Sequence, residues 1–166
     1  MTTTPTDDTM AAITRAVVLG REGDPATARA ELLAIWETLG PHGDPMHRCT
    51  LAHYLADLYD DAAQALTWDL RALDAADTLT NDRLAHYHSG LDVRAFYPSL
   101  HLNLADNYRR LRSFDAAEHH IDKARACSDT LPDNPYGTLI RTAIPEVHAA
   151  IRAGDTTPRQ TAPTAR

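Results

Sequence analysis

The sequence predicts an all-α fold of about seven helices, arranged as stacked antiparallel hairpins with a capping helix at the C-terminal end. Two observations lead to this prediction. Apolar residues recur at helical spacing along most of the 166 residues, and Gly and Pro fall mostly at the joins between these segments. A chain of this length can bury one core without disulfides or metal, so we expect a single domain over residues 9–153. Residues 1–8 and 154–166 have little to bury, and we expect them to be disordered.

The first three helices are separated by turns that carry recognisable start signals. The first helix is expected over residues 8–20, before "REGDP" ends it. Its apolar face carries Met10, Ile13 and Val17. Asp24 followed by Pro25 starts a second helix, and Asp44 followed by Pro45 starts a third. Asp at the cap position with Pro in the first turn is typical of a helix N-terminus, because Pro lacks only an N–H that would be unpaired there.

The fourth helix allows two inner faces, and the last helix contains a proline. Asp61 and Gln64 form a capping box that opens the fourth helix, which fades near Thr80. We expect its core face to be formed by Leu66, Leu70 and Leu73 with Trp68 to one side, or alternatively by Ala65 and Ala72. After "PDNP" a seventh helix is predicted, and Pro145 is expected to kink it. Its apolar residues are Leu139, Ile140, Ile144, Val147 and Ile151.

Two of the predicted hairpins look alike. The spacing L-A-x-x-Y occurs at residues 104–108 and again at residues 55–59. The helix that follows the later motif carries Ala117, Ile121 and Ala124. This pattern resembles the tetratricopeptide repeat family. The resemblance implies a short right-handed solenoid in which Ala105 and Ala117 lie where two helices cross, and in which the first helices line a concave, peptide-binding groove.

The resemblance also implies which residues line that groove. We expect Asp106 to pair with Arg110 four residues later, which leaves Arg109 and Arg112 free.

A long segment, residues 81–98, stands where repeats need only a short turn. We interpret it either as a border of the groove or as a packed helix extension. The candidate binding residues are His53, Asp57, His86, Tyr87, His88, Asn103, Asp106, Arg109 and Arg110.

Composition excludes several classes of function. A net charge of −7 opposes nucleic-acid binding, and no window approaches the ~20 apolar residues that a membrane span needs. The only two cysteines, Cys49 and Cys127, have no CxxC spacing. The first ten residues lack the basic start and apolar centre of a signal peptide. We therefore expect a cytoplasmic protein with free thiols.

The nine histidines do not have the spacing of a metal site. His119 and His120 diverge by about 100° around a helix, so one ion cannot easily bind both, and we expect both to lie at the surface with no metal or other cofactor. His53 and Asp57 lie one helical turn apart, and a carboxylate there could orient the imidazole for acid–base chemistry. No partner nucleophile is identifiable by motif.

The sequence therefore predicts a non-catalytic module, a monomer or homodimer, that binds a protein or peptide. The acidic net charge favours a partner with a basic segment. Two alternatives remain. One is a small-molecule or metal-dependent enzyme built around His53, Asp57 and His86. The other is a structural module that self-associates through an exposed Trp68 or through the last helix.

Overall fold

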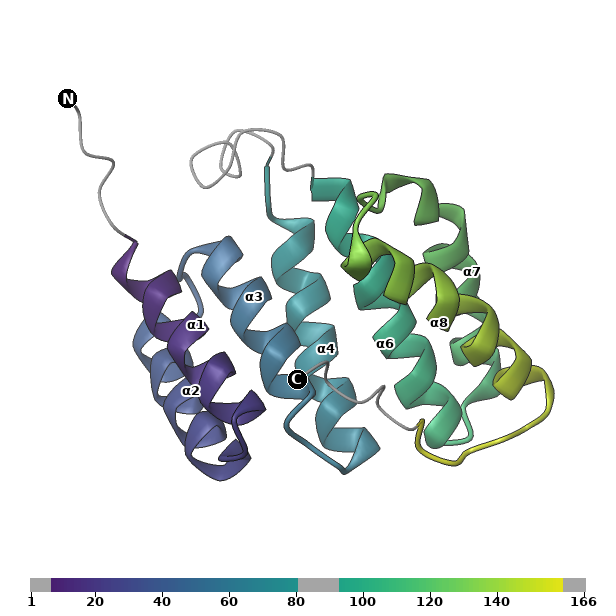
Figure 1. Ribbon diagram of the computed structural model, residues 1–166, viewed down its shortest axis with the longest axis horizontal. Helices are drawn as coiled ribbons and strands as arrows, with labels where there is room; N and C mark the ends of the chain where they lie inside the picture. Colours follow the sequence, from purple (N-terminus) through teal and green to yellow (C-terminus); the bar gives the residue numbers. More distant parts are fainter. Residues whose placement is uncertain (1–6, 81–92, 160–166) are drawn as a thin grey trace.

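The computed structural model describes residues 7–80 and 93–159, and all regular structure within these ranges is helical (Figure 1). The seven α-helices described are α1 (Asp8–Arg21), α2 (Pro25–Leu39), α3 (Pro45–Ala56), α4 (Ala62–Asp77), α6 (Tyr97–Arg110), α7 (Phe114–Ala126) and α8 (Pro135–Arg152). Two short 3₁₀ turns, η1 (Val93–Phe96) and η2 (Ser128–Thr130), precede α6 and follow α7. The predicted all-α class is confirmed.

The helix starts follow the capping residues that the sequence indicated. The carboxylates of Asp24, Asp44 and Asp61 accept backbone N–H groups of the first turns of α2, α3 and α4. Asn134 caps α8 by accepting the N–H of Gly137. Each cap satisfies donors that have no partner within the helix, which fixes where the helix begins.

Consecutive helices pack as hairpins. The pairs are α1 with α2, α3 with α4, and α6 with α7, while α8 lies across both α6 and α7 (Figure 1). Helix α4 packs against α6 as well as α3, and so joins the first two hairpins to the third. One apolar cluster lies among α1 to α4 and reaches the start of α6, and a second lies among α6, α7 and α8. Ala105 and Ala117 are fully buried in the second cluster, as expected.

The inner face of α4 is the alanine face. Ala65 and Ala72 are buried, Trp68 is only 7% exposed, and Leu70 is 36% exposed. The prediction was therefore wrong for Leu70 and for Trp68, whereas Leu73 is partly buried against the core and the alternative with the alanines holds. Small alanine side chains let α4 approach both α3 and α6, whereas leucines at those positions would hold the helices apart.

The C-terminal part of the described chain returns to the helices. Helix α8 continues through Pro145, and residues 154–159 then run back past α6. The guanidinium of Arg109 donates to the backbone carbonyls of Asp155 at 2.6 Å and Thr157 at 2.9 Å, and Arg159 pairs with Glu146. The backbone carbonyls that make the contacts with Arg109 carry no sequence signal.

Candidate functional site

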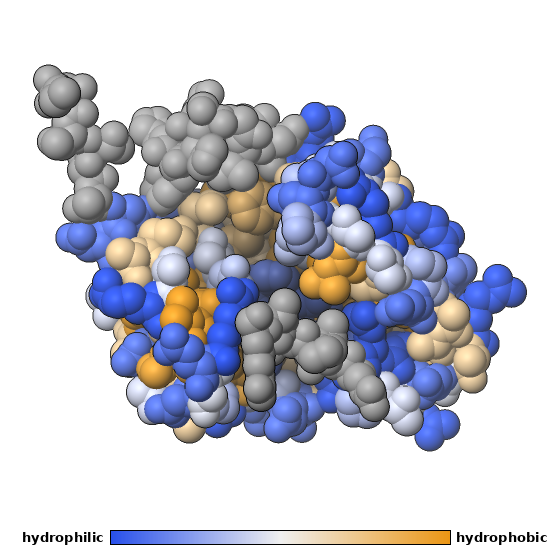
Figure 2. Space-filling model, in the orientation of Figure 1, coloured by the Kyte–Doolittle hydropathy of each residue, from blue (hydrophilic) through white to orange (hydrophobic). Residues whose placement is uncertain are grey.

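A cluster of polar side chains lies where α3 and α6 both meet α4. Its members, called the recess cluster below, are His53 and Asp57 of α3 and its C-cap, Asp69 of α4, and Asn103 and Asn107 of α6. Figure 2 shows hydrophilic side chains in a recess between the surface over α1 and the surface over α8. The cluster joins helices that are distant in the chain, and α4 supplies its centre.

Asp69 is the centre of the recess cluster. Its side chain is only 2% exposed, and its two oxygens accept the side-chain amides of Asn107 at 2.7 Å and Asn103 at 3.4 Å. The Nδ1 atom of His53 lies 3.6 Å from Asp69 Oδ1, slightly longer than a hydrogen bond, and has no other partner among the described residues. A buried carboxylate is costly unless it is paired, and these three groups supply the pairing.

The local sequence explains how these side chains come to share one place. Residues 65, 69, 72 and 76 recur at helical spacing on α4, so Asp69 stands on the buried alanine stripe. Asn103 and Asn107 are one turn apart on α6 and therefore reach the same carboxylate. His53 and Asp57 are one turn apart on α3.

Burial and charge act against each other in this cluster. Burial raises the pKa of Asp69. The contact with His53 and the charge of His53 lower that pKa, and so do the hydrogen bonds from the amides of Asn103 and Asn107. Burial disfavours the charged form of His53, but its contact with Asp69 and the charges of Asp57 and Asp69 outweigh this and raise the pKa of the imidazole. Both shifts favour the protonated forms, and the close contact lets His53 and Asp69 share a proton.

Asp57 is the member of the recess cluster that is open to solvent. Its side chain is exposed, yet the protein around it limits its hydration and raises the pKa of the carboxyl. The charges of His53 and Arg21 lower that pKa, and the charge of Asp69 raises it. The cluster holds two acidic side chains and one imidazole, and the guanidinium of Arg21 lies near enough to Asp57 to act on its charge. The arrangement can accept hydrogen bonds from a cationic group, and it can hold a proton on His53.

The structure separates three of the expected groove residues from this cluster. Asp106 pairs with Arg109 at 2.7 Å, three residues away, and not with Arg110 as expected. Arg109 is 1% exposed and holds the C-terminal segment, so the expectation that it is free was wrong. Arg110 donates to the carbonyl of Asp60 in the turn before α4. His86, Tyr87 and His88 lie outside the described residues.

Sequence reasoning missed Asp69 and Asn107, although one signal was present. Asp69 interrupts an alanine stripe at helical spacing, and an acidic residue on a buried stripe needs partners. That signal points to Asp69 but not to its partners, because Asn107 is 38 residues away in the chain. His53, Asp57 and Asn103 were predicted as groove residues and do lie together with Asp69.

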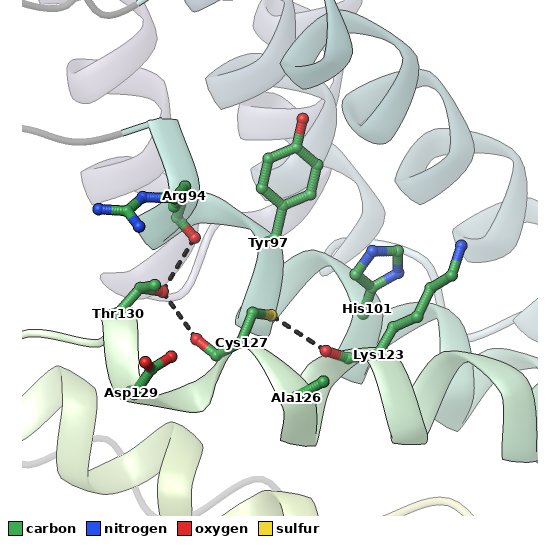
Figure 3. A pocket seen from close by; sticks show the side chains of 8 residues that line it. All are labelled: Arg94, Tyr97, His101, Lys123, Ala126, Cys127, Asp129 and Thr130. Atoms are coloured by element: carbon green, nitrogen blue, oxygen red, sulfur yellow. Dashed lines mark hydrogen bonds between the residues drawn. The ribbon is translucent and has the colours of Figure 1, made fainter.

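A second hollow lies at the other end of α6. It has a volume of about 450 Å³ and lies among η1, α6, α7 and η2 (Figure 3). Its lining residues are Arg94, Tyr97, His101, Lys123, Ala126, Cys127, Asp129 and Thr130. In Figure 3 the charged ends of Arg94 and Lys123 point away from each other. The Cys127 thiol donates a hydrogen bond to the backbone carbonyl of Lys123 at 3.1 Å. These groups do not converge on one ligand position.

The described residues contain neither a candidate metal cluster nor a candidate membrane span. Within residues 7–80 and 93–159, no three His, Cys, Asp or Glu side chains come together so that they could hold a metal ion. In the same part of the chain, no helix has the length and apolar character required to cross a membrane. Comparison with protein-family models, with curated proteins and with solved structures gives no significant match.

Proposed function

We propose that this chain is a non-catalytic binding module, resembling a short tetratricopeptide solenoid, that holds a protein or peptide segment against the recess cluster. The observation that carries the proposal is the solvent-exposed carboxyl of Asp57, one helical turn from His53, which in turn contacts the buried carboxyl of Asp69. The hairpin packing and the buried pair Ala105 and Ala117 support the resemblance.

The ligand chemistry follows from the exposed member of the cluster. Asp69 is enclosed by its partners and cannot reach a ligand directly, whereas Asp57 presents its carboxylate to solvent. A Lys or Arg side chain of the partner would pair with Asp57, and the buried Asp69 would add longer-range attraction in a poorly hydrated setting. The partner segment therefore carries a basic residue.

The test uses labelled short peptides that differ only in carrying Lys, Arg or Gln at the central position. We expect fluorescence anisotropy to show binding of the Lys or Arg peptides and loss of that binding in Asp57→Lys. Asp115→Lys is the matched control, because Asp115 is an exposed acid in the first turn of α7 and away from the cluster. Equal binding by the two variants, or preference for the Gln peptide, would refute the proposal.

The contact between His53 and Asp69 supports a second candidate, an acid–base reaction. A buried carboxylate behind a partly exposed imidazole is the arrangement that orients a general base. The other members of the recess cluster, however, carry only amide or carboxyl groups, and none of them is a hydroxyl or thiol nucleophile. Hydrolysis of simple ester substrates by the wild type, abolished in His53→Gln at unchanged melting temperature, would favour this candidate over binding.

A further inference from the structure

The two tryptophans of the chain meet on a different side of α4 from the recess cluster. Trp36 of α2 and Trp68 of α4 pack edge to face, with ring centroids 5.2 Å apart and planes at 86°. Asp69 and Arg71 are two positions apart on α4, which places them about 200° apart around the helix. The tryptophan pair and Arg71 therefore belong to a surface that the proposed peptide site does not use.

Two arginines stack on this tryptophan pair. The guanidinium carbon of Arg48 lies 3.9 Å from the centre of the Trp36 ring. The guanidinium carbon of Arg71 lies 4.3 Å from the Trp68 ring centre and 5.7 Å from the Trp36 ring centre. The guanidinium groups of Arg48 and Arg71 therefore both lie close to the Trp36 ring. Burial, followed by the nearby charge of Arg71, lowers the pKa of Arg48, which agrees with their proximity.

No carboxylate of the described residues neutralises this pair. Arg48 donates to the backbone carbonyl of Gly40, and Arg71 is exposed with only its ring contacts. Arg109, Arg125 and Arg159, by contrast, each have an Asp or Glu within 4 Å. In a chain with a net charge of −7, these two neighbouring guanidinium groups form a local concentration of positive charge. Their mutual repulsion is a cost that a bound anion would remove.

We propose that Arg48 and Arg71, held on Trp36 and Trp68, form a binding site for the phosphate group of a monoester. A guanidinium placed over an indole ring can keep N–H groups available at its edge, and that edge matches the spacing of phosphate oxygens. Arg48 shares its edge with the carbonyl of Gly40, and Arg71 has no such bond within the described part of the chain. Two guanidinium groups balance the charge of a phosphate dianion. The indole rings are occupied by the arginines, so the site recognises the anion and does not stack a nucleotide base.

The same chemistry could be presented by a free phosphate compound or by a phosphorylated side chain of a partner. Net acidity disfavours a polyanion such as nucleic acid, whose many phosphates would be repelled by the rest of the surface. A single phosphate group needs only the local pair of arginines. The experiment below separates the two sources by comparing inorganic phosphate with a phosphoserine peptide.

The site provides its own reporter, because Trp36 and Trp68 are the only tryptophans in the sequence. Intrinsic tryptophan fluorescence of the whole chain is titrated with sodium phosphate, with a phosphoserine peptide and with the same peptide unphosphorylated, all at constant ionic strength. We expect a saturable change with both phosphates, half complete at roughly millimolar concentration or below, and none with the unphosphorylated peptide. Calorimetric titration checks the same binding without relying on fluorescence.

The variant Arg71→Glu should weaken phosphate binding at least about tenfold, because it replaces an attractive charge with a repulsive one. Arg152→Glu at the end of α8 makes the same change in net charge on an exposed residue elsewhere and should bind as the wild type does. Similar affinity for phosphate and the phosphopeptide supports a site for small phosphate compounds, and tighter peptide binding supports a phosphorylated partner. A non-saturating response, or equal binding by the two variants, overturns the proposal.

Discussion

Acid should destabilise this protein through the pair His101 and His120. Their Nδ1 atoms lie 3.0 Å apart, so one ring donates a hydrogen bond to the other, which requires that the accepting nitrogen carry no proton. Burial lowers the pKa of both imidazoles to about 4. The charge of Lys123 and the presence of His119 act in the same direction, while Asp77 acts against it for His101.

The sign of the effect follows from linkage. Above the ordinary pKa of 6.5 both rings are neutral in the folded and unfolded chain, and their contribution to stability is complete. As the pH falls from 6.5 towards 4, the unfolded chain takes up two protons that the folded chain does not accept. Stability is therefore lost across this window, and the loss ends once the folded state also binds protons.

The size of the effect follows from the two lowered pKa values. One pKa unit corresponds to about 1.4 kcal/mol, so a fully desolvated imidazole with a pKa of about 4 would lose roughly 3 kcal/mol over this window. Solvent reaches part of the pair, because His120 is only half-buried, and the two titrations are coupled. We therefore expect a combined loss of about 3 kcal/mol for the pair.

The assay is urea unfolding followed by circular dichroism at pH values across the window. His101→Phe removes one titrating group and the hydrogen bond, and it should reduce the loss attributed to the pair to about 1 kcal/mol. His42→Gln, on the exposed turn before α3, is the control and should keep the wild-type pH dependence. If the stability of His101→Phe falls with pH in parallel with the wild type, the reasoning about this pair is wrong.

Other predictions concern packing and the C-terminal segment. Ala105→Leu and Ala117→Leu should each lower the free energy of unfolding by about 1 to 3 kcal/mol, because the larger side chain overpacks a buried site. Ala149→Leu, on an exposed face of α8, should leave it unchanged. Unchanged unfolding midpoints of the first two variants would contradict this. Arg109→Ala should lower the free energy of unfolding by about 2 to 4 kcal/mol, because it leaves Asp106 without its partner and removes the bonds to the carbonyls of Asp155 and Thr157. Amide hydrogen exchange at residues 154–159 should become faster. Arg112→Ala, which is exposed, should change neither quantity.

The helices and their starts could be predicted from the sequence because these features are local. The cap at Asp24 uses an N–H only three residues away, and the caps at Asp44 and Asp61 use N–H groups two or three residues away. The buried alanines of α6 and α7 were predictable for a related reason, since helical spacing places them on one stripe. Such information is contained within a few neighbouring residues.

The candidate site was predictable only in part. His53, Asp57 and Asn103 could be chosen because they lie on helices expected to line a groove, but the partner that joins them, Asp69, was not. The pairing of Asp106 was assigned to Arg110 at the favourable four-residue spacing. In the fold, Arg109 bonds to the carbonyls of Asp155 and Thr157, which are 46 and 48 residues away in the chain. In this position its guanidinium also bonds to Asp106, so that Asp106 pairs with Arg109 and not with Arg110.

The sequence by itself determined that this chain is helical, where most helices begin, and that its surface is acidic. The tertiary structure decided which stripe of α4 faces inward, because the leucine and alanine stripes are one residue, or about 100°, apart and both are compatible with the helix. Close approach of α3 and α6 favours the small side chains, and that choice buries Asp69 and Trp68 together. The rotation of α4 about its own axis, which turns the alanine stripe inward, therefore places both the recess cluster and the arginine pair on the tryptophans.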